Sequence, residues 1–378
     1  MRRLVGTVAA VVAAAGCVST VLPPATASGF RLEEDERSLW RQAEEAEDQF
    51  EKGGAVYADA DLETYLNDVA RRLEPPEVLV AIPFRIRVVR NPYLNAFTLP
   101  NGRIYLHTGM LARMENEAQL ATLLGHEMTH ATHRRAVRER RNLSNNAAFA
   151  VGLNSILPGV GSLAGFSAVR GYSREMETEA DDNAMRLLAN AGYDVREAPK
   201  LFAHLKEQLN EEKQSEPFFF GTHPALDDRI ENYRRLIELQ YGHRPAGATH
   251  AQTFLQRTRD VVHENAILDL RAGRFVAAER GARKYGALDP AAARGPFLLG
   301  ELSRQRGGET AAEAALTEYR RAVSLDASYP EPYRAMGLVL YKRGDKAGAK
   351  EAFDKYLSLV PQASDRAYIE QYLGSSTK

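Results

Sequence analysis

The chain has little cysteine and no excess of charge of either sign. Cys17 is the only cysteine among 378 residues, which excludes an internal disulfide and a zinc cluster built from thiolates. A metal site would therefore need histidine and carboxylate ligands. The formal net charge of −1 gives no electrostatic basis for binding nucleic acid or an anionic membrane surface. The chain is long for one hydrophobic core, so we expect two domains.

Long apolar runs are also scarce. Residues 4–16, which follow two arginines, form one uncharged run of apolar and small residues. That run is too short to cross a membrane and is typical of a secretory signal. In residues 142–171, Asn154, Pro158 and several glycines interrupt every apolar stretch. This segment therefore predicts a mobile loop, or a helix–loop–helix, beside a cleft and not a membrane-spanning helix.

Two processing sites compete near the end of the predicted signal. "AAGC" at 14–17 resembles a bacterial lipobox, which would make Cys17 the lipidated N-terminus. "ATA" at 25–27 would instead let an ordinary signal peptidase cleave after Ala27. The residue after the cysteine is Val18. An aspartate at this position would oppose sorting of a bacterial lipoprotein to the outer membrane, so Val18 favours that membrane. Both alternatives predict a signal peptide within residues 1–27 and an exported chain, either free in the periplasm or lipid-anchored to the outer membrane.

Hydrophobic periodicity predicts a mixed domain over residues 30–240. The expected elements are helices at 32–50, 59–76, 116–140, 173–194 and 221–239, a strand at 84–90 and a hairpin at 95–111. Pro75 and Pro76 are expected to end the second helix, and Asn116 is expected to cap the third. The polar segment 241–250 contains proline and glycine and is expected to be the linker between domains.

Beyond this segment the sequence repeats about every 34 residues. In residues 332–361, Gly337, Gly344, Ala349 and Phe353 stand where a tetratricopeptide repeat has small and large residues. Two earlier copies precede this one, and residues 364–373 can cover the last. Each copy predicts two antiparallel helices, and three copies are about the minimum that stacks stably. The sequence therefore predicts an all-α tetratricopeptide-repeat solenoid over residues 250–378.

The segment "GHEMTH" carries the chemistry of the first domain. On a helix, positions four apart lie about 40° apart around the axis and ~6 Å along it, so His126 and His130 can share one ion. Glu127 is rotated by about 100° from His126 and can reach a water molecule bound to that ion. Two imidazoles, an open position and a carboxylate base are what metal-assisted hydrolysis requires. The spacing alone also occurs in helices that bind no metal.

A third protein ligand is expected because catalytic zinc usually has three. "EMETEADD" supplies several acids on a later helix. Glu177 and Asp181 are four apart and share one face, as do Glu175 and Glu179, and such pairs of acids are unfavourable unless a cation lies nearby. If Glu177 binds zinc, Asp181 can accept the outer N–H of a ligand histidine and fix its tautomer. The alternative is a solvated acidic helix start.

Three segments together resemble one known family. "NAFTLPNGRIYLHTGML", "GHEMTH" and "SREMETEAD" are similar to the zinc metallopeptidase family that contains the CAAX prenyl endopeptidase and HtpX. The resemblance runs from about Asp59 to Arg229. Exported BepA-like members, which lack membrane spans and end in tetratricopeptide repeats, match best. The resemblance implies an α+β fold, with a mainly helical zincin-type metallopeptidase domain, a small β-sheet and the repeat solenoid after it.

The resemblance also implies roles for single residues. The third zinc ligand is the glutamate of an E-x-x-A-D motif, here formed by Glu177, Ala180 and Asp181. A histidine and an arginine six apart, here His223 and Arg229, lie near the zinc in this family. They either stabilise the oxyanion or, in some members, block the site. With Glu127 as the base, one zinc ion per chain would be held by His126, His130 and Glu177.

The expected function is that of a zinc-dependent endopeptidase of the bacterial cell envelope. The resemblance implies misfolded or stalled outer-membrane proteins as substrates, and the repeats would dock substrate or the outer-membrane assembly machinery. The chain would contact a membrane only through a lipid anchor at Cys17. The alternative is a chaperone or assembly scaffold that acts mainly through the repeats and keeps a gated protease site.

Two further interpretations concern residues near the predicted site. His133 is one turn beyond His130 and too distant to share the same ion, so we expect it to pack or to support the ligands. The hairpin at 95–106 is either an edge that binds substrate as an added strand or part of the core.

Overall fold

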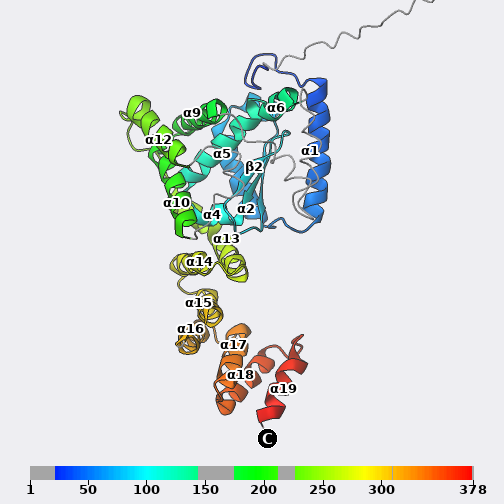
Figure 1. Cartoon of the computed structure of the whole chain (residues 1–378), viewed down its shortest axis with the longest axis vertical. Helices are drawn as coiled ribbons and strands as arrows, with labels where there is room; N and C mark the ends of the chain where they lie inside the picture. The colour runs from blue at the N-terminus through cyan, green and yellow to red at the C-terminus, as the bar shows by residue number, and fades with distance from the viewer. Residues whose placement is uncertain (1–21, 144–173, 212–225, 309, 377–378) are drawn as a thin grey trace, which may run out of the picture.

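The computed structural model describes residues 22–143, 174–211, 226–308 and 310–376 (Figure 1). Cys17, His223 and nearly all of the predicted loop at 142–171 lie outside these ranges. An α+β domain at the N-terminal end continues into a column of paired helices (Figure 1). This arrangement confirms the predicted fold class of a mainly helical domain with a small sheet, followed by an all-α region.

The N-terminal domain is built from helices around one sheet. Its α-helices are α1 (Glu34–Lys52), α2 (Ala60–Leu73), α3 (Pro76–Ala81), α4 (Thr108–Arg113), α5 (Glu117–Thr132), α6 (Arg135–Leu143), α9 (Arg174–Asn190), α10 (Ala198–Glu211) and α12 (Leu226–Leu236). Two short turns are η1 (Val195–Glu197) and η2 (Ile237–Tyr241). The strands are β1 (Arg85–Val89), β2 (Ala96–Thr98) and β3 (Arg103–His107). The short helices α3 and α4 were not expected: Pro76 begins α3, because proline fits the first turn of a helix.

The sheet has the strand order β1-β3-β2. β1 runs parallel to β3, and β2 pairs antiparallel to β3 through the predicted hairpin. Gly102 closes the hairpin turn with φ +82°, and a Cβ atom there would lie 2.5 Å from Ile82 Cγ2, so glycine is required on both counts. Within the described residues β3 is the central strand and β2 is an edge strand. β3 is therefore a core strand and β2 keeps a free edge, and substrate binding at that edge stays a prediction.

Helix α5 lies at the centre of the domain. Every one of its residues is buried, so it lacks the polar face of a surface helix. The Asn116 side chain accepts a hydrogen bond from the Gln119 amide at 3.0 Å, which confirms the predicted N-cap. The predicted long helix at 116–140 was wrong in one respect. It breaks at Arg134, where φ is +54°, and α6 continues in another direction.

Helix α9 packs closely along α5. At the contact, a Cβ atom on Gly125 would lie 3.3 Å from Ala184 Cα. The absence of a side chain at Gly125 therefore allows the two helix backbones to approach each other. This contact is one residue from His126 and three residues from Asp181, so it sets the spacing between the two segments that carry the predicted ligands.

The helices of the C-terminal region form three antiparallel pairs and a final cap. The pairs are α13 (Ala251–Arg271) with α14 (Phe275–Leu288), α15 (Arg294–Arg306) with α16 (Ala311–Leu325), and α17 (Pro330–Lys342) with α18 (Lys346–Leu359), and α19 (Arg366–Ser376) follows. Gly300 packs against the Tyr319 ring and Gly337 against the Phe353 ring. Small residues thus face aromatic residues within the repeats, as the sequence predicts.

The first repeat is joined to the N-terminal domain by direct packing. Phe254 and Val261 of α13 are fully buried in the core of the N-terminal domain. The Thr108 hydroxyl donates to Asn265 Oδ1 at 2.9 Å. Lys284 Nζ of α14 donates to the carbonyl oxygens of Ala112 at 2.8 Å and Met114 at 2.6 Å.

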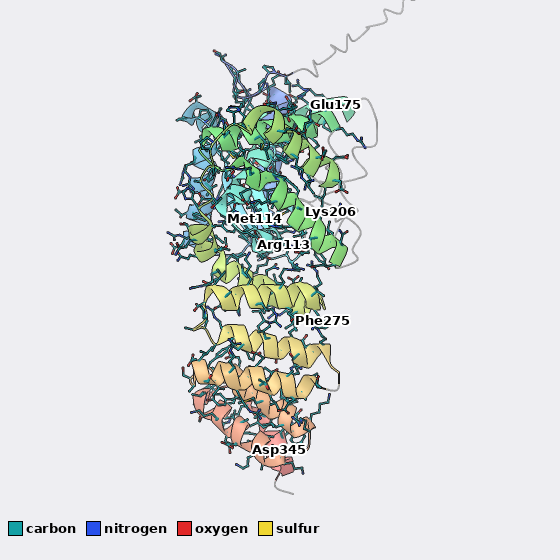
Figure 2. All side chains as sticks on the ribbon, turned by 90° about the vertical axis from the view of Figure 1, so that its left-hand side faces the viewer. Arg113, Met114, Glu175, Lys206, Phe275 and Asp345 are labelled. Carbon is teal, nitrogen blue, oxygen red and sulfur yellow. The ribbon has the colours of Figure 1, made fainter. Side chains whose placement is uncertain are left out.

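A cleft of about 430 Å³ lies beside this junction, between α4, α10, α13 and α14. Figure 2 shows Arg113 and Met114 at the end of the N-terminal domain that faces the repeats.

The segment expected to be a linker also has fixed contacts. The Ala248 amide donates to Gly192 O at 2.9 Å, and the Glu117 amide donates to Thr249 O at 3.0 Å. A Cβ atom on Gly247 would lie 2.4 Å from the Tyr193 carbonyl. The junction therefore follows the surface of the N-terminal domain closely. Among the helices that the structure describes, none is both long and apolar enough to span a membrane.

Candidate metal centre

Three predicted ligands converge between α5 and α9. One ligand atom each from His126, His130 and Glu177 lies within 4.8 Å of the other two, and all three residues are buried. The two histidine Nε2 atoms are 3.1 Å apart. Glu177 Oε2 lies 3.2 Å from His126 Nε2, and Glu177 Oε1 lies 3.6 Å from His130 Nε2. Helical spacing places the histidines side by side, and the close approach of α9 adds the carboxylate.

This donor set fits a transition-metal ion of the zinc type. Two imidazole nitrogens and one carboxylate are a recurrent ligand set of catalytic zinc, with a fourth position left for water or substrate. A buried carboxylate close to two histidines is costly without a compensating cation. The chemistry and the convergence therefore agree with the sequence-based prediction that these three residues hold one ion.

Glu127 lies on the same turn of α5, beside strand β2. Its side chain is only 1% exposed, so its orientation is restricted. Thr98 Oγ1 donates a hydrogen bond to Glu127 Oε2 at 2.7 Å. The other carboxylate oxygen, Oε1, has no hydrogen-bond partner among the described residues. One oxygen is therefore held by the sheet, and the other is available to a small polar molecule.

Asp181 holds the outer side of His126. Its Oδ1 atom lies 2.9 Å from His126 Nδ1 and accepts from the Tyr233 hydroxyl at 2.7 Å and from Arg229 Nη2 at 2.5 Å. In the tautomer that donates from Nδ1 to the Asp181 carboxylate, His126 keeps the Nε2 lone pair toward the ligand cluster. Burial would raise the pKa of the Asp181 carboxyl, but the Arg229 charge and the bond from His126 hold it below its ordinary value.

Arg229 lies behind the ligands. It is 1% exposed, and its guanidinium lies 4.0 Å from the centre of the Phe202 ring. Its Nη2 atom is 2.8 Å from His126 Nδ1, which is the ring nitrogen that faces away from the ligand cluster. The resemblance implies that Arg229 either stabilises an oxyanion or blocks the site, and both roles stay predictions. Its contacts place the guanidinium at Asp181, whose carboxylate lies 2.9 Å from His126.

A second buried arginine flanks the other histidine. Arg135, with no exposed surface, places Nη1 2.8 Å from His130 Nδ1 and Nη2 3.3 Å from Glu179 Oε2. His133 Nε2 lies 3.4 Å from Glu179 Oε1. His133 is thus outside the ligand cluster, and Glu179 joins it to Arg135.

The structure brings together most of the predicted site residues and adds others. His126, His130, Glu177 and Asp181 form one cluster, whereas His223 and Cys17 lie outside the described ranges. Sequence reasoning missed Tyr233, although it is four residues after Arg229 and therefore on the same helix face. It also missed Thr98 and Arg135. Thr98 reaches Glu127 only because β2 packs against α5, and no local pattern indicates that contact.

Two segments of the chain match models of known protein families. Residues 57–237 match the model of peptidase family M48, and residues 312–344 match a TPR repeat model. The chain is 30% identical over 195 residues to the putative beta-barrel assembly-enhancing protease of Vibrio cholerae, covering 47% of this chain and 40% of that protein. It is 33% identical over 192 residues to the mitochondrial metalloendopeptidase OMA1 of Danio rerio, covering 47% of this chain and 40% of that protein.

A third relative, the beta-barrel assembly-enhancing protease of Yersinia pestis, is 30% identical over 188 residues, covering 46% of this chain and 38% of that protein. The matches thus span about two fifths of these relatives. Residues 57–237 are thus similar to peptidase family M48, and a segment with similarity to a TPR repeat follows on the C-terminal side.

Proposed function

We propose that this chain is a zinc-dependent endopeptidase of the bacterial cell envelope that cleaves misfolded or stalled outer-membrane proteins. The observation that carries the proposal is the convergence of His126, His130 and Glu177 within 4.8 Å, with the Glu127 carboxylate on the same helix turn. The family match and the names of the relatives as proteases support the reaction class.

The reaction follows from the arrangement of the side chains. Zinc held by His126, His130 and Glu177 would supply Lewis acidity that lowers the pKa of water and polarises a peptide carbonyl. Glu127 accepts the proton of the attacking water at Oε1 and delivers it to the leaving amide nitrogen as the carbon–nitrogen bond breaks. Asp181 and Arg229 keep His126 in the orientation that its role requires.

The edge of β2 provides a binding surface for an extended substrate segment. The Leu99 amide donates to Arg103 O at 2.7 Å, and the His107 amide donates to Asn95 O at 3.0 Å. Hydrogen-bonding groups alternate along an antiparallel strand, so the main-chain groups of Ala96 and Thr98 point away from β3. A substrate strand paired there would pass directly beside Glu127.

His223 belongs to the proposal through the family resemblance alone. It would either stabilise the oxyanion or occupy the open ligand position of the metal, and His223→Ala separates these roles. Activity falls by about 10²–10³-fold if the histidine acts as an oxyanion donor. Activity rises if the histidine blocks the metal.

The cell-envelope location rests on the predicted signal and on the N-terminal contacts of the domain. Leu22 and Ala25 are buried, and the Arg134 side chain donates to Pro23 O at 3.3 Å. Cleavage after Ala27 would remove these residues, whereas processing at Cys17 would retain them. We therefore favour Cys17 as the lipidated N-terminus. The names of the Vibrio and Yersinia relatives, which refer to beta-barrel assembly, support outer-membrane substrates and a docking role for the repeats.

The experiment uses the purified chain with unfolded outer-membrane protein as substrate. We expect about one zinc ion per chain and slow proteolysis. Glu127→Gln should retain zinc and lose proteolysis, and Glu177→Ala should lose both. Glu44→Gln, the same type of change at an exposed position of α1, is the matched control. Full activity of Glu127→Gln would refute the role of Glu127 as the base. Absence of proteolysis by the wild-type chain would refute the proposal and would favour a scaffold that acts through its repeats.

A further inference from the structure

Thr98 makes a hydrogen bond that the strand itself does not need. Its hydroxyl lies 2.7 Å from Glu127 Oε2, although the two residues are 29 positions apart in the chain. The main chain of β2 is already held in register by pairing with β3, where Thr98 faces Ile104. The side-chain bond therefore adds nothing to strand pairing, and its effect falls on the Glu127 carboxylate.

The position of Thr98 is itself well fixed. The neighbouring Phe97 ring stacks on Tyr105 with centroids 5.2 Å apart and planes inclined by 19°. The Leu99 amide on the other side is bonded to Arg103 O. Threonine is branched at Cβ, which restricts its χ1 angle. The hydroxyl is thus a donor with little freedom, presented by a strand anchored on both sides.

A glutamate side chain has several rotatable bonds, and a buried carboxylate without partners can adopt more than one rotamer. The bond from Thr98 removes this freedom, because it fixes Oε2 and leaves Oε1 as the oxygen without a partner among the described residues. A hydrogen bond to an ionised acceptor is short and strong. The rate of proton transfer depends steeply on the position of the accepting oxygen, here Glu127 Oε1.

We propose that Thr98 is a positioning residue that orients Glu127 for proton transfer. The proposal rests on the proposed peptidase function and deepens it. The main-chain N–H and C=O of Thr98 point to the free edge of β2, where a substrate strand would pair. The Thr98 side chain donates to Glu127, so the same residue contacts both the substrate and the base. Because the main chain supplies the substrate contacts, removal of the hydroxyl acts on turnover and leaves substrate binding unchanged.

The test compares Thr98→Val with Thr98→Ser in the full chain. Valine keeps the branched shape and lacks the donor, and we expect kcat to fall by about 10–100-fold with KM and bound zinc unchanged. Serine restores the donor and should return kcat to within about threefold of wild type. Thr64→Val is the matched control, because the Thr64 hydroxyl is exposed and bonds only within α2.

Two results would overturn the proposal. They are an unchanged kcat in Thr98→Val, whether or not KM rises, and loss of bound zinc from this variant. A crystal structure of Thr98→Val provides a readout that does not depend on activity. We expect the Glu127 carboxylate to rotate or to occupy two orientations. If it keeps the wild-type orientation, Thr98 does not position it. If wild type shows no Glu127-dependent proteolysis, the peptidase function fails, and the crystal structure still decides the role of Thr98.

Discussion

The main-chain amide of Ala25 donates a hydrogen bond to the carbonyl oxygen of Thr132 at 2.7 Å. Thr132 is the last residue of α5 and lies two positions after His130. The segment before α1 is therefore joined to the helix that carries two of the candidate metal ligands. Arg134 strengthens this junction through Glu36 and through its stacking on the Phe30 ring at 5.2 Å.

We predict that removal of residues 22–27 destabilises the domain. A chain that begins at Ser28 loses the burial of Leu22 and Ala25 and two hydrogen bonds, together worth about 2–4 kcal/mol. Urea unfolding of this chain and of one that begins at Val18 measures the difference. Equal midpoints would show that the segment contributes nothing to the fold.

The same contacts lead to a prediction on maturation. If the chain is processed at Cys17, the mature protein should incorporate labelled palmitate and fractionate with membranes, and Cys17→Ser should abolish the label. Mass spectrometry of the mature N-terminus checks this directly. A terminus at Ser28 would contradict the lipid anchor.

Asp181 should control metal affinity without binding the metal. Asp181→Asn weakens the bond that orients His126 and leaves the Arg229 charge uncompensated, so we expect metal affinity to fall by about 10–100-fold. Competition with a chelator of known affinity measures this change. Asp182→Asn, at the exposed neighbouring position, is the control and should bind metal as wild type does. Equal metal affinities of Asp181→Asn and Asp182→Asn would show that Asp181 does not support the metal site.

Glu74 should make stability depend on pH. Both of its carboxylate oxygens are buried without a hydrogen-bond partner in the described part of the chain. Burial raises the pKa of this carboxyl from 4.5 to about 7, and Arg186 offsets only part of the effect. The folded chain therefore keeps this proton to higher pH than the unfolded chain does. Stability should consequently fall as pH rises from about 4.5 to about 7.

Glu74→Gln removes this titration. We expect the variant to unfold at the same denaturant concentration as wild type at pH 4.5, and to be more stable by about 2 kcal/mol at pH 8. Glu77→Gln, at an exposed position of α3, controls for the loss of a charge. If the free energies of unfolding of Glu74→Gln and wild type differ by the same amount at every pH in this range, Glu74 is not the group whose titration lowers stability.

The peptidase domain should require the first repeat helix. A chain that ends at Thr249 lacks Phe254 and Val261, which are buried in the core of the domain, and the loss of two such side chains costs several kcal/mol, roughly 4–8. A chain that ends at Leu288 keeps α13, α14 and the Lys284 contacts. We expect the longer chain to melt within about 5 °C of wild type and the shorter one to melt far lower. Equal melting temperatures would show that the domain is independent of α13.

Local patterns predicted the parts of this fold that depend on local physics. Apolar periodicity predicted the main helices, and the spacing of His126 and His130 predicted one shared ion. The break at Arg134 was not predictable, because its left-handed backbone is held by contacts with Glu36 and Pro23, about 100 residues away in the chain. The contact of Arg229 with Asp181 depends on where α12 packs against α9. That position is a result of tertiary packing, and the spacing of residues along the sequence does not reveal it.

The contact between Gly125 and Ala184 sets how closely the two helices that carry the candidate ligands approach each other. An alanine at Gly125 would place its methyl carbon 3.3 Å from Ala184 Cα, and α5 and α9 would have to separate by a few tenths of an ångström. Zinc holds imidazole nitrogens at about 2.0–2.1 Å, so a shift of that size between Glu177 and the two histidines would weaken its binding. The spacing of the ligand cluster thus depends on a position that carries no ligand atom and no side chain.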